Sequence, residues 1–351
     1  MSQYMLYGGF NPVEPTLNGL NDLDDTSPIG RIYEVDVTYP QHLHNDQNDL
    51  SYLPQNSIPS GSKVRKLMAT FEEKKNYIVH YQNLQQEIKN GLKVEKVHRV
   101  IQFNQSNWLA KYIDLNTQMR KKARNAFEKD FFKLMNNAVF GFAVLDISKT
   151  LMYDYHYNVM KAHYGNRIKL MYTDTDSLVY HISTENFYED LAANANLLNR
   201  MDTVNLPSDH PCYVRDRKKH PGYFSDEVDG NMITEFCALR AKSYAFNIYA
   251  GPEENKDHRK CLFGEDGVEL YRDNVSIRSF NHQLMTISTK KLTYNSYDDK
   301  RVVLDDKIHT IAHGHYSIEE DDWFELDGEE QNWNEKEKGL MRGLLHCITC
   351  I

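Results

Sequence analysis

The chain has few cysteines, no long apolar run and no low-complexity tract. Five cysteines are spread over 351 residues, and an odd, widely spaced set is typical of a reducing compartment. No apolar stretch reaches the length that spans a bilayer. The first residues lack the basic and apolar regions of a signal peptide. We therefore expect an intracellular protein without a membrane partner.

The charge balance also limits the function classes. The chain has 41 basic and 50 acidic residues, a formal net charge of −9. This weighs against a general nucleic-acid coat, although a local basic groove remains compatible with it. Hydrophobic residues make up 40% of the chain and charged residues 26%. These values predict a globular protein with enough core for two or three domains.

Two short apolar runs flank a polar turn between residues 168 and 182. The alternating apolar positions are Ile168, Leu170 and Tyr172 before the turn, and Leu178, Tyr180 and Ile182 after it. This period of two predicts a β-hairpin with residues 174–176 at its tip.

Asp174 and Asp176 stand close together at this tip. Two carboxylates at such a separation repel each other unless a cation lies between them. Mg²⁺ is the expected cation because it prefers one or two hard carboxylates together with substrate phosphates. Asp is also common in ordinary turns, where it makes local hydrogen bonds.

A basic helical run precedes the hairpin, from about Trp108 to Phe140. It ends in Lys133-Leu-Met-Asn-Asn-Ala-Val-Phe-Gly141, in which Lys133, Asn137, Phe140 and Gly141 fall on one helical face. A lysine on that face can meet a triphosphate as a point charge. A run of charges on a helix also fits an ordinary solvated face.

The string Tyr172-Thr-Asp-Thr-Asp-Ser177 resembles motif C of the family B DNA polymerases, and the Lys133–Gly141 string resembles their motif B. The resemblance implies that Asp174 and Asp176 hold the catalytic metals. It places Lys133 at the triphosphate, Asn137 and Phe140 in the nucleotide pocket, and Arg120 and Lys121 at a further fingers contact. Ala138 and Phe140 stand where the motif has Ser and Tyr.

Residues 233–246 are predicted as one strand that carries Arg240, Lys242 and Tyr244. In position it resembles the Lys-x-Tyr element with which the family grips the primer strand, through contacts that include phosphates. Together with Gly141, these three residues are the expected DNA contacts.

Further strings resemble a viral and transposon-borne (Polinton-like) branch of the family, related to protein-primed enzymes. They are Tyr7-Gly-Gly-Phe10, Glu34-Val-Asp-Val-Thr-Tyr-Pro40 and Leu43-His-Asn-Asp46. The first lies in a turn expected at 7–12, and the second in an alternating strand expected at 30–40 and ended by its proline. Asp36 lies too near Tyr39 to be the motif A aspartate. The resemblance therefore implies that the chain begins just after motif A. The segment between motifs B and C is also expected to be missing, since Phe140-Gly141 runs straight into Phe142.

The resemblance implies an α+β fold with the right-hand architecture of polymerases. We expect a palm-proximal segment at 1–70, fingers at 71–141, palm at 142–240, a palm–thumb region at 241–316 and an unassigned acidic tail at 317–351. Residues 142–158 are predicted as one long helix. The implied activity is addition of deoxynucleotides to a primer 3′ end. Its partners are primer–template DNA, deoxynucleoside triphosphates, Mg²⁺ or Mn²⁺, and a terminal protein if priming uses one.

Two other functions fit parts of the sequence. One is an inactive polymerase remnant that binds primer–template DNA without extending it. The other is a glycosyltransferase whose Asp-x-Asp pair holds a metal and a nucleotide-sugar. Three further sets are interpreted as structural rather than metal-binding. Cys347-x-x-Cys350 lacks a second ligand pair for zinc. The other two sets are the histidines His309, His313 and His315, and the carboxylates Asp216, Asp226 and Asp229, which are expected at the surface.

Overall fold

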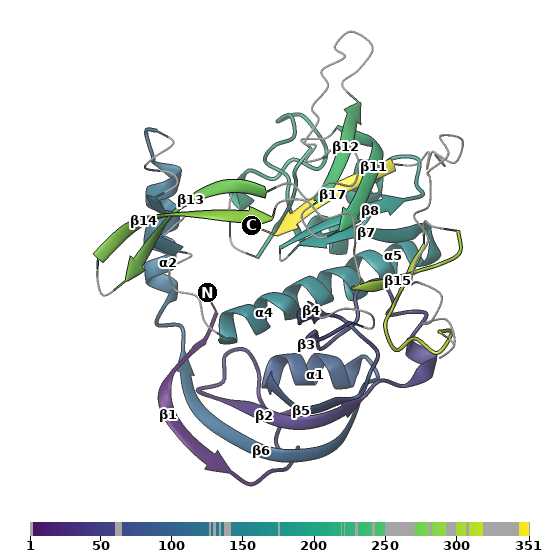
Figure 1. Ribbon diagram of the computed structural model, residues 1–351. Helices are drawn as coiled ribbons and strands as arrows, with labels where there is room; N and C mark the ends of the chain where they lie inside the picture. The colour runs from purple at the N-terminus through teal and green to yellow at the C-terminus, as the bar shows by residue number, and fades with distance from the viewer. Residues whose placement is uncertain are drawn as a thin grey trace. The chain divides into compact units, whose positions relative to one another are not determined.

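The computed structural model describes residues 3–59, 65–125, 128, 131–132, 135–136, 142–174, 176–218, 220, 222–228, 231–240, 243–249, 271–280, 283–292, 300–306, 309–318 and 344–350. The chain divides into two compact units (Figure 1). Unit 1 comprises residues 1–159 and 302–325, and unit 2 comprises residues 160–301 and 326–351. Helices and sheets occur in both units, which confirms the mixed α+β class.

Unit 1 is built on a four-stranded antiparallel sheet in the order β1-β6-β2-β5. Its strands are β1 (Met5–Val13), β2 (Ile29–Thr38), β5 (Lys74–His80) and β6 (Lys93–Ser106). Strand β2 has the predicted alternation: Tyr33, Val35 and Val37 are buried, and the residues between them are partly exposed. One face of the sheet therefore supplies the core of this unit.

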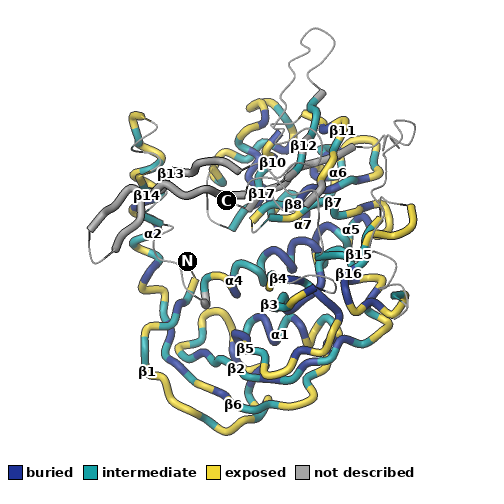
Figure 2. The backbone as a smooth tube through the Cα atoms, viewed as in Figure 1, coloured by how far each residue is buried: buried dark blue, intermediate teal, exposed yellow. Residues whose placement is uncertain are grey.

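Helices cover that inner face. Helix α1 (Tyr81–Lys89) packs on β2 and β5, and α4 (Phe142–Tyr153) packs on α1, β5 and β1 (Figure 1). Helix α4 continues as a π-helix over Asp154–Lys161, which confirms the predicted long helix. Figure 2 shows buried segments concentrated along α1 and the strands beneath it. Helix α2 (Ala110–Lys121) follows β6.

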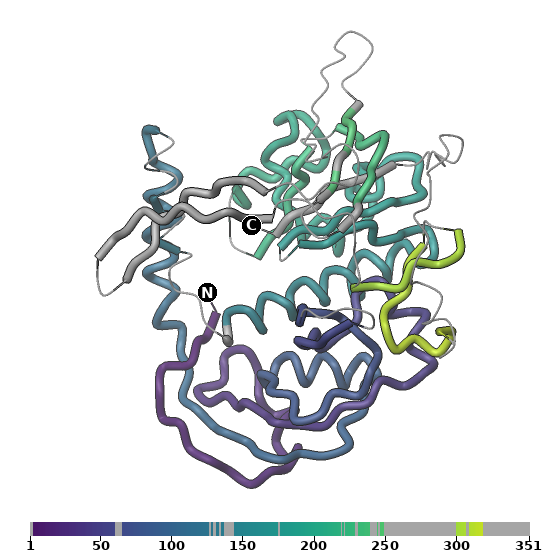
Figure 3. Tube along the Cα trace, viewed as in Figure 1, coloured from purple at the N-terminus to yellow at the C-terminus, as the bar shows by residue number. Residues whose placement is uncertain are grey.

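A late segment of the chain returns to unit 1, beside residues 44–71 (Figure 3). There β15 (Arg301–Val303) pairs with β16 (Thr310–Ala312), while a short ribbon of β3 (Gln55–Ser57) and β4 (Lys66–Met68) lies earlier in the unit. The Asn48 side chain donates to the Thr310 carbonyl (3.2 Å) and accepts from the Ala312 N–H (2.9 Å). The Phe71 N–H donates to the His313 carbonyl at 2.8 Å. These bonds join segments more than 200 residues apart.

Unit 2 contains a seven-stranded sheet. Its strands are β7 (Ile168–Asp174), β8 (Ser177–Ile182), β9 (Met201–Asp202), β10 (Phe224–Asp226), β11 (Met232–Arg240), β12 (Ser243–Tyr249) and β17 (Leu344–Cys350). Strand β17 pairs with β8, β10 and β11. A long ribbon of β13 (Tyr271–Phe280) and β14 (Gln283–Leu292) forms a separate sheet. Helices α5 (Ala162–Tyr164), α6 (Phe187–Ala193) and α7 (Ala195–Leu198) are short.

Three sequence predictions of local structure are wrong. Residues 7–12 form part of β1 rather than a turn, because register shifts in the β1–β6 pairing accommodate Gly8 and Gly9 as bulges. Residues 233–246 form a hairpin of β11 and β12, with Arg240 paired to Ser243, rather than one strand. The basic helical run is interrupted, because α2 ends at Lys121 and residues 122–125 are not helical.

No helix within the described ranges is long and apolar enough to cross a membrane.

Unit 1 also buries an acidic pair between α1 and α4. Glu87 is almost completely buried, and burial, reinforced by the charge of Asp146, raises its pKa well above the ordinary range. The Asp146 carboxylate accepts the His80 N–H at 3.1 Å and lies 3.4 Å from the Lys149 ammonium. Burial nevertheless raises the pKa of Asp146. Folding therefore favours the protonated form of these acids.

The raised pKa of Glu87 makes the stability of unit 1 depend on pH. The unfolded Glu87 ionises above about pH 4.3, whereas the raised pKa of the folded Glu87 lets it keep its proton to a higher pH, so stability falls as pH rises through this window. Each unit of upward shift costs about 1.4 kcal/mol at high pH. Glu87→Gln is expected to remove this loss, which urea unfolding of the full chain at pH 5 and pH 8 measures. The exposed Glu14 offers the control Glu14→Gln, and an unchanged pH dependence in Glu87→Gln would contradict the assignment.

Candidate active site

The predicted hairpin is confirmed, and it carries both candidate aspartates at its tip. Strands β7 and β8 pair antiparallel from Ile168–Ile182 to Asp174–Ser177. The Asp174 carbonyl accepts the Asp176 N–H at 2.6 Å and the Ser177 hydroxyl at 3.1 Å. These two bonds define a tight turn in which Asp174 ends one strand and Asp176 lies directly before the other.

The platform beneath this tip is rigid. Strand β8 is hydrogen-bonded on one side to β7 and on the other to β17 (Figure 1). Its residues Leu178, Val179 and Tyr180 are almost completely buried. A strand paired on both edges and packed in the core cannot shift register without exposing its apolar side chains. The two aspartates are therefore held at a fixed place.

The tip offers two hard oxygen donors with different exposure. Asp174 is partly buried, while Asp176 is exposed. This donor set fits Mg²⁺ or Mn²⁺, which bind one or two carboxylates and take remaining ligands from phosphates and water. Among the residues placed by the structure, no three His, Cys, Asp or Glu side chains gather as a potential metal site. Asp174 and Asp176 are thus the carboxylates that the described hairpin can offer.

An aromatic cluster lies beside the hairpin. The Tyr172 ring lies 4.8 Å from the Tyr244 ring and 6.3 Å from the Phe236 ring, between centroids. The Tyr244 ring stacks in turn on Phe236 (6.1 Å) and on Phe246 (6.2 Å). Strands β11 and β12 thus bring Tyr244, an expected primer contact, against the residue two positions before Asp174. The sequence alone gave no sign of the contributions of Phe236 and Phe246.

Other expected site residues are described only in part. Lys133, Asn137, Phe140, Gly141 and Lys242 lie outside the described residues. Arg240 is described only through its backbone, which pairs with Ser243. Arg120 and Lys121 lie in the last turn of α2, where Lys121 is exposed and Arg120 is partly buried.

Asp36 has a local role in the sheet of unit 1. Its carboxylate accepts the Asn76 N–H at 2.8 Å and contacts the His98 ring at 2.8 Å. The Asn76 N–H bond, followed by the His98 bond, lowers the pKa of Asp36. Asn76 has a left-handed backbone, with φ of 50°, so this bond fixes a local irregularity between β2 and β5.

The structure also describes several of the histidines and aspartates that were interpreted as structural rather than metal-binding. The His315 ring contacts the Asn45 amide oxygen (3.2 Å) with one nitrogen and accepts the Ser317 N–H (3.1 Å) with the other. The expectation for Asp226 is wrong: it is buried rather than at the surface, and it accepts the Tyr188 hydroxyl and the Val228 N–H. Asp216 is exposed as expected, and Asp229 lies outside the residues that the structure describes.

A family model for type B DNA polymerases, organellar and viral, matches residues 7–226. The chain belongs to this family. The match confirms the resemblance seen in the sequence, and it includes the β7–β8 hairpin with both aspartates. The β11–β12 hairpin with Tyr244 lies beyond the matched range. No curated protein and no solved structure gives a significant match to this type B polymerase chain.

The contact between Tyr172 and Tyr244 predicts a measurable coupling. Aromatic pairs at this distance contribute about 0.5–1.5 kcal/mol beyond the area they bury. A double-mutant cycle with Tyr172→Leu and Tyr244→Leu is expected to give a coupling energy in that range, measured by urea unfolding. Tyr172 and Tyr188 form the control cycle, because the described rings that they contact differ: Phe236 and Tyr244 for Tyr172, and Phe187 and His210 for Tyr188. An equal coupling in both cycles would argue against a specific contact.

The donor set at the hairpin tip predicts a divalent-ion site. Binding of Mn²⁺, followed by electron paramagnetic resonance, is expected to weaken at least about tenfold in Asp174→Asn. Asp176→Asn is expected to weaken it less, because exposed Asp176 faces more competition from water. Asp216→Asn removes an exposed carboxylate elsewhere in unit 2 and is expected to leave binding unchanged. An equal loss in all three variants would show diffuse attraction to an acidic surface.

Proposed function

We propose that this chain is a template-directed DNA polymerase whose reaction takes place at the β7–β8 hairpin. The observation that carries the proposal is the position of Asp174 and Asp176 at the tip of a rigid hairpin, inside the range matched by the polymerase family. In the reaction, the primer 3′ oxygen forms a bond to the α-phosphorus of a deoxynucleoside triphosphate. The bond from that phosphorus to the bridging oxygen breaks, and pyrophosphate leaves.

The two aspartates would hold divalent ions for this step. When bound, Mg²⁺ or Mn²⁺ supplies activation of the 3′ hydroxyl and neutralisation of the charge on the leaving pyrophosphate. Asp174, at the end of β7, is the proposed principal ligand, and Asp176 supports it. Catalysis by such a site consists of positioning and charge stabilisation, so the fixed register of the hairpin is the contribution of the protein.

The remaining roles follow from the resemblance. Lys133, Arg120 and Lys121 would meet the triphosphate, while Asn137 and Phe140 form the nucleotide pocket. Tyr244, with Arg240, Lys242 and Gly141, would contact DNA. The position of the Tyr244 ring, 4.8 Å from the Tyr172 ring of the β7–β8 hairpin, supports this role. The primer is a DNA strand, or a terminal protein whose hydroxyl starts synthesis. The right-hand arrangement of palm (142–240), fingers (71–141) and palm–thumb (241–316), with the flanking segments 1–70 and 317–351, belongs to the same proposal.

Primer extension by the full chain tests the proposal. With labelled primer–template, all four deoxynucleoside triphosphates and Mg²⁺ or Mn²⁺, the wild type is expected to add template-directed nucleotides. Asp174→Asn is expected to reduce the rate at least about 100-fold, because charge stabilisation at the reacting centre is lost. Asp216→Asn is the matched control, with an unchanged rate, and circular dichroism checks that each variant is folded.

Two outcomes would replace the proposal. A folded wild type that binds primer–template but extends it with neither metal would indicate an inactive polymerase-derived DNA-binding protein. A wild type that binds a nucleotide-sugar with Mn²⁺ but does not bind primer–template would favour the glycosyltransferase alternative.

A further inference from the structure

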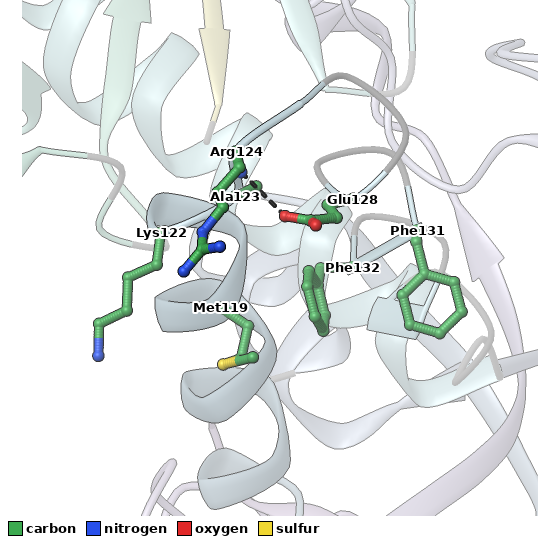
Figure 4. Close-up of a pocket in the computed structure, with 7 residues that line it drawn as sticks. All are labelled: Met119, Lys122, Ala123, Arg124, Glu128, Phe131 and Phe132. Carbon is green, nitrogen blue, oxygen red and sulfur yellow. Dashed lines mark hydrogen bonds between the residues drawn. The ribbon is translucent and has the colours of Figure 1, made fainter.

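A pocket of about 380 Å³ lies where the basic helix of unit 1 is interrupted. Its lining residues are Met119, Lys122, Ala123, Arg124, Glu128, Phe131 and Phe132 (Figure 4). The volume falls within the range of about 300–1,000 Å³ that is usual for small-molecule sites. None of these residues is part of the metal hairpin.

The local sequence explains the interruption of the helix at this pocket. Helix α2 ends at Lys121, residues 122–125 are not helical, and the next helical residue among those described is Glu128. The Asn125 side chain accepts the Glu128 N–H at 2.8 Å, and the Glu128 carboxylate accepts the Arg124 N–H at 2.9 Å. This arrangement resembles a capping box, which starts a new helix, except that the Glu128 carboxylate accepts the N–H of Arg124 rather than that of Asn125. The end of α2 and the described residues that follow it therefore line the same pocket.

The two walls have different chemistry. Figure 4 shows Met119 and the cationic side chains of Lys122 and Arg124 on one side, and the rings of Phe131 and Phe132 on the other. Lys122 and Arg124 are exposed, and 45% of the Phe131 surface is exposed. Residues 120–133 contain six basic and two acidic residues, in a chain with a net charge of −9. The pocket is thus a local surface of cations and aromatic rings, with one carboxylate from Glu128, on an acidic protein.

Such a surface suits a ligand that combines phosphates with flat, unpaired bases. Proteins that bind single-stranded nucleic acid pair cations along the backbone with aromatic rings on which bases stack. A free nucleoside triphosphate instead needs cations that converge on one point. Figure 4 shows the Lys122 ammonium directed away from the phenyl rings and from the Arg124 guanidinium. Cations spaced in this way match phosphates that repeat along a strand.

We propose that this pocket binds single-stranded DNA, with an unpaired base stacked on Phe131 and neighbouring phosphates at Lys122 and Arg124. The inference extends the proposed polymerase function, because a template must be presented as a single strand. Binding at this pocket does not depend on the β7–β8 hairpin or on nucleotide transfer.

Binding of a fluorescent oligothymidine to the full chain, followed by anisotropy without nucleotides and with a metal chelator, tests this inference. Phe131→Ala is expected to weaken binding about fivefold or more, the effect of losing one stacked base. Phe131→Trp retains an aromatic ring and is expected to restore binding, which separates stacking from a folding defect. Phe10→Ala removes an exposed ring that does not line the pocket and serves as the control.

The salt dependence of binding tests the cationic wall. Each lost phosphate contact is expected to reduce the slope of log affinity against log salt by about 0.7 for a single strand. Lys122→Ala and Arg124→Ala should each show this change, whereas Lys75→Ala, which removes an exposed charge elsewhere in unit 1, should not. Equal effects in the pocket and control variants would overturn the inference. Weakening of deoxythymidine triphosphate binding by Phe131→Ala to the same extent as oligonucleotide binding would overturn it too, because it would identify the pocket as a nucleotide site.

Asp174→Asn separates this inference from the proposed function. It is expected to bind the oligonucleotide as the wild type does while losing primer extension. Loss of extension with retained Phe131-dependent binding would leave the pocket assignment intact even if the chain proves unable to polymerise. Conversely, if the chain is an active polymerase but Phe131→Ala does not weaken oligonucleotide binding, the proposed function stands and the assignment of the pocket is wrong.

Discussion

The tight turn that holds Asp174 and Asp176 one residue apart at the end of the β7–β8 hairpin is the constraint on which the proposed site depends. Asp174 and Asp176 cannot move apart freely, because the Asp174 carbonyl is bonded both to the Asp176 N–H and to the Ser177 hydroxyl. Two neighbouring carboxylates are the donors that a divalent cation prefers. In the function proposed above, this arrangement supports metal-assisted nucleotide transfer.

The surroundings of the hairpin serve to keep this arrangement fixed. Strand β8 is paired on both edges, and its buried side chains prevent a register slip that would turn the aspartates to the other face. The aromatic rings of β11 and β12 then pack on Tyr172, so the strand that ends in Asp174 also contacts a second hairpin. The strands that build the sheet of unit 2 thus also position the two aspartates of the proposed reaction.

Unit 1 is distinguished by two buried acids and by a break in its basic helix. Its core encloses Glu87 and Asp146, and burial raises the pKa of both acids. For Asp146, the Lys149 ammonium and the His80 N–H act in the opposite direction and partly offset the effect of burial. Its basic helix is not continuous, since Asn125 and Glu128 cap a new helical start. The break turns a charged helical surface into a pocket with one cationic and one aromatic wall.

The sequence by itself determined the hairpin, the long helix at 142–158 and the polymerase family, because period-two alternation and a dense motif are local signals. It also contained the Asn125-x-x-Glu128 capping signal, which the stronger helical run around it obscured. Only the tertiary structure decided that Gly8 and Gly9 form bulges inside a strand, that residues 232–249 turn back as a hairpin, and that Asp226 is buried. Likewise, the contact of Tyr172 with Phe236 and Tyr244 depends on strands more than 60 residues apart. Bulges, turns and burial are set by the partner strand, and a partner's identity is a long-range fact that local patterns do not encode.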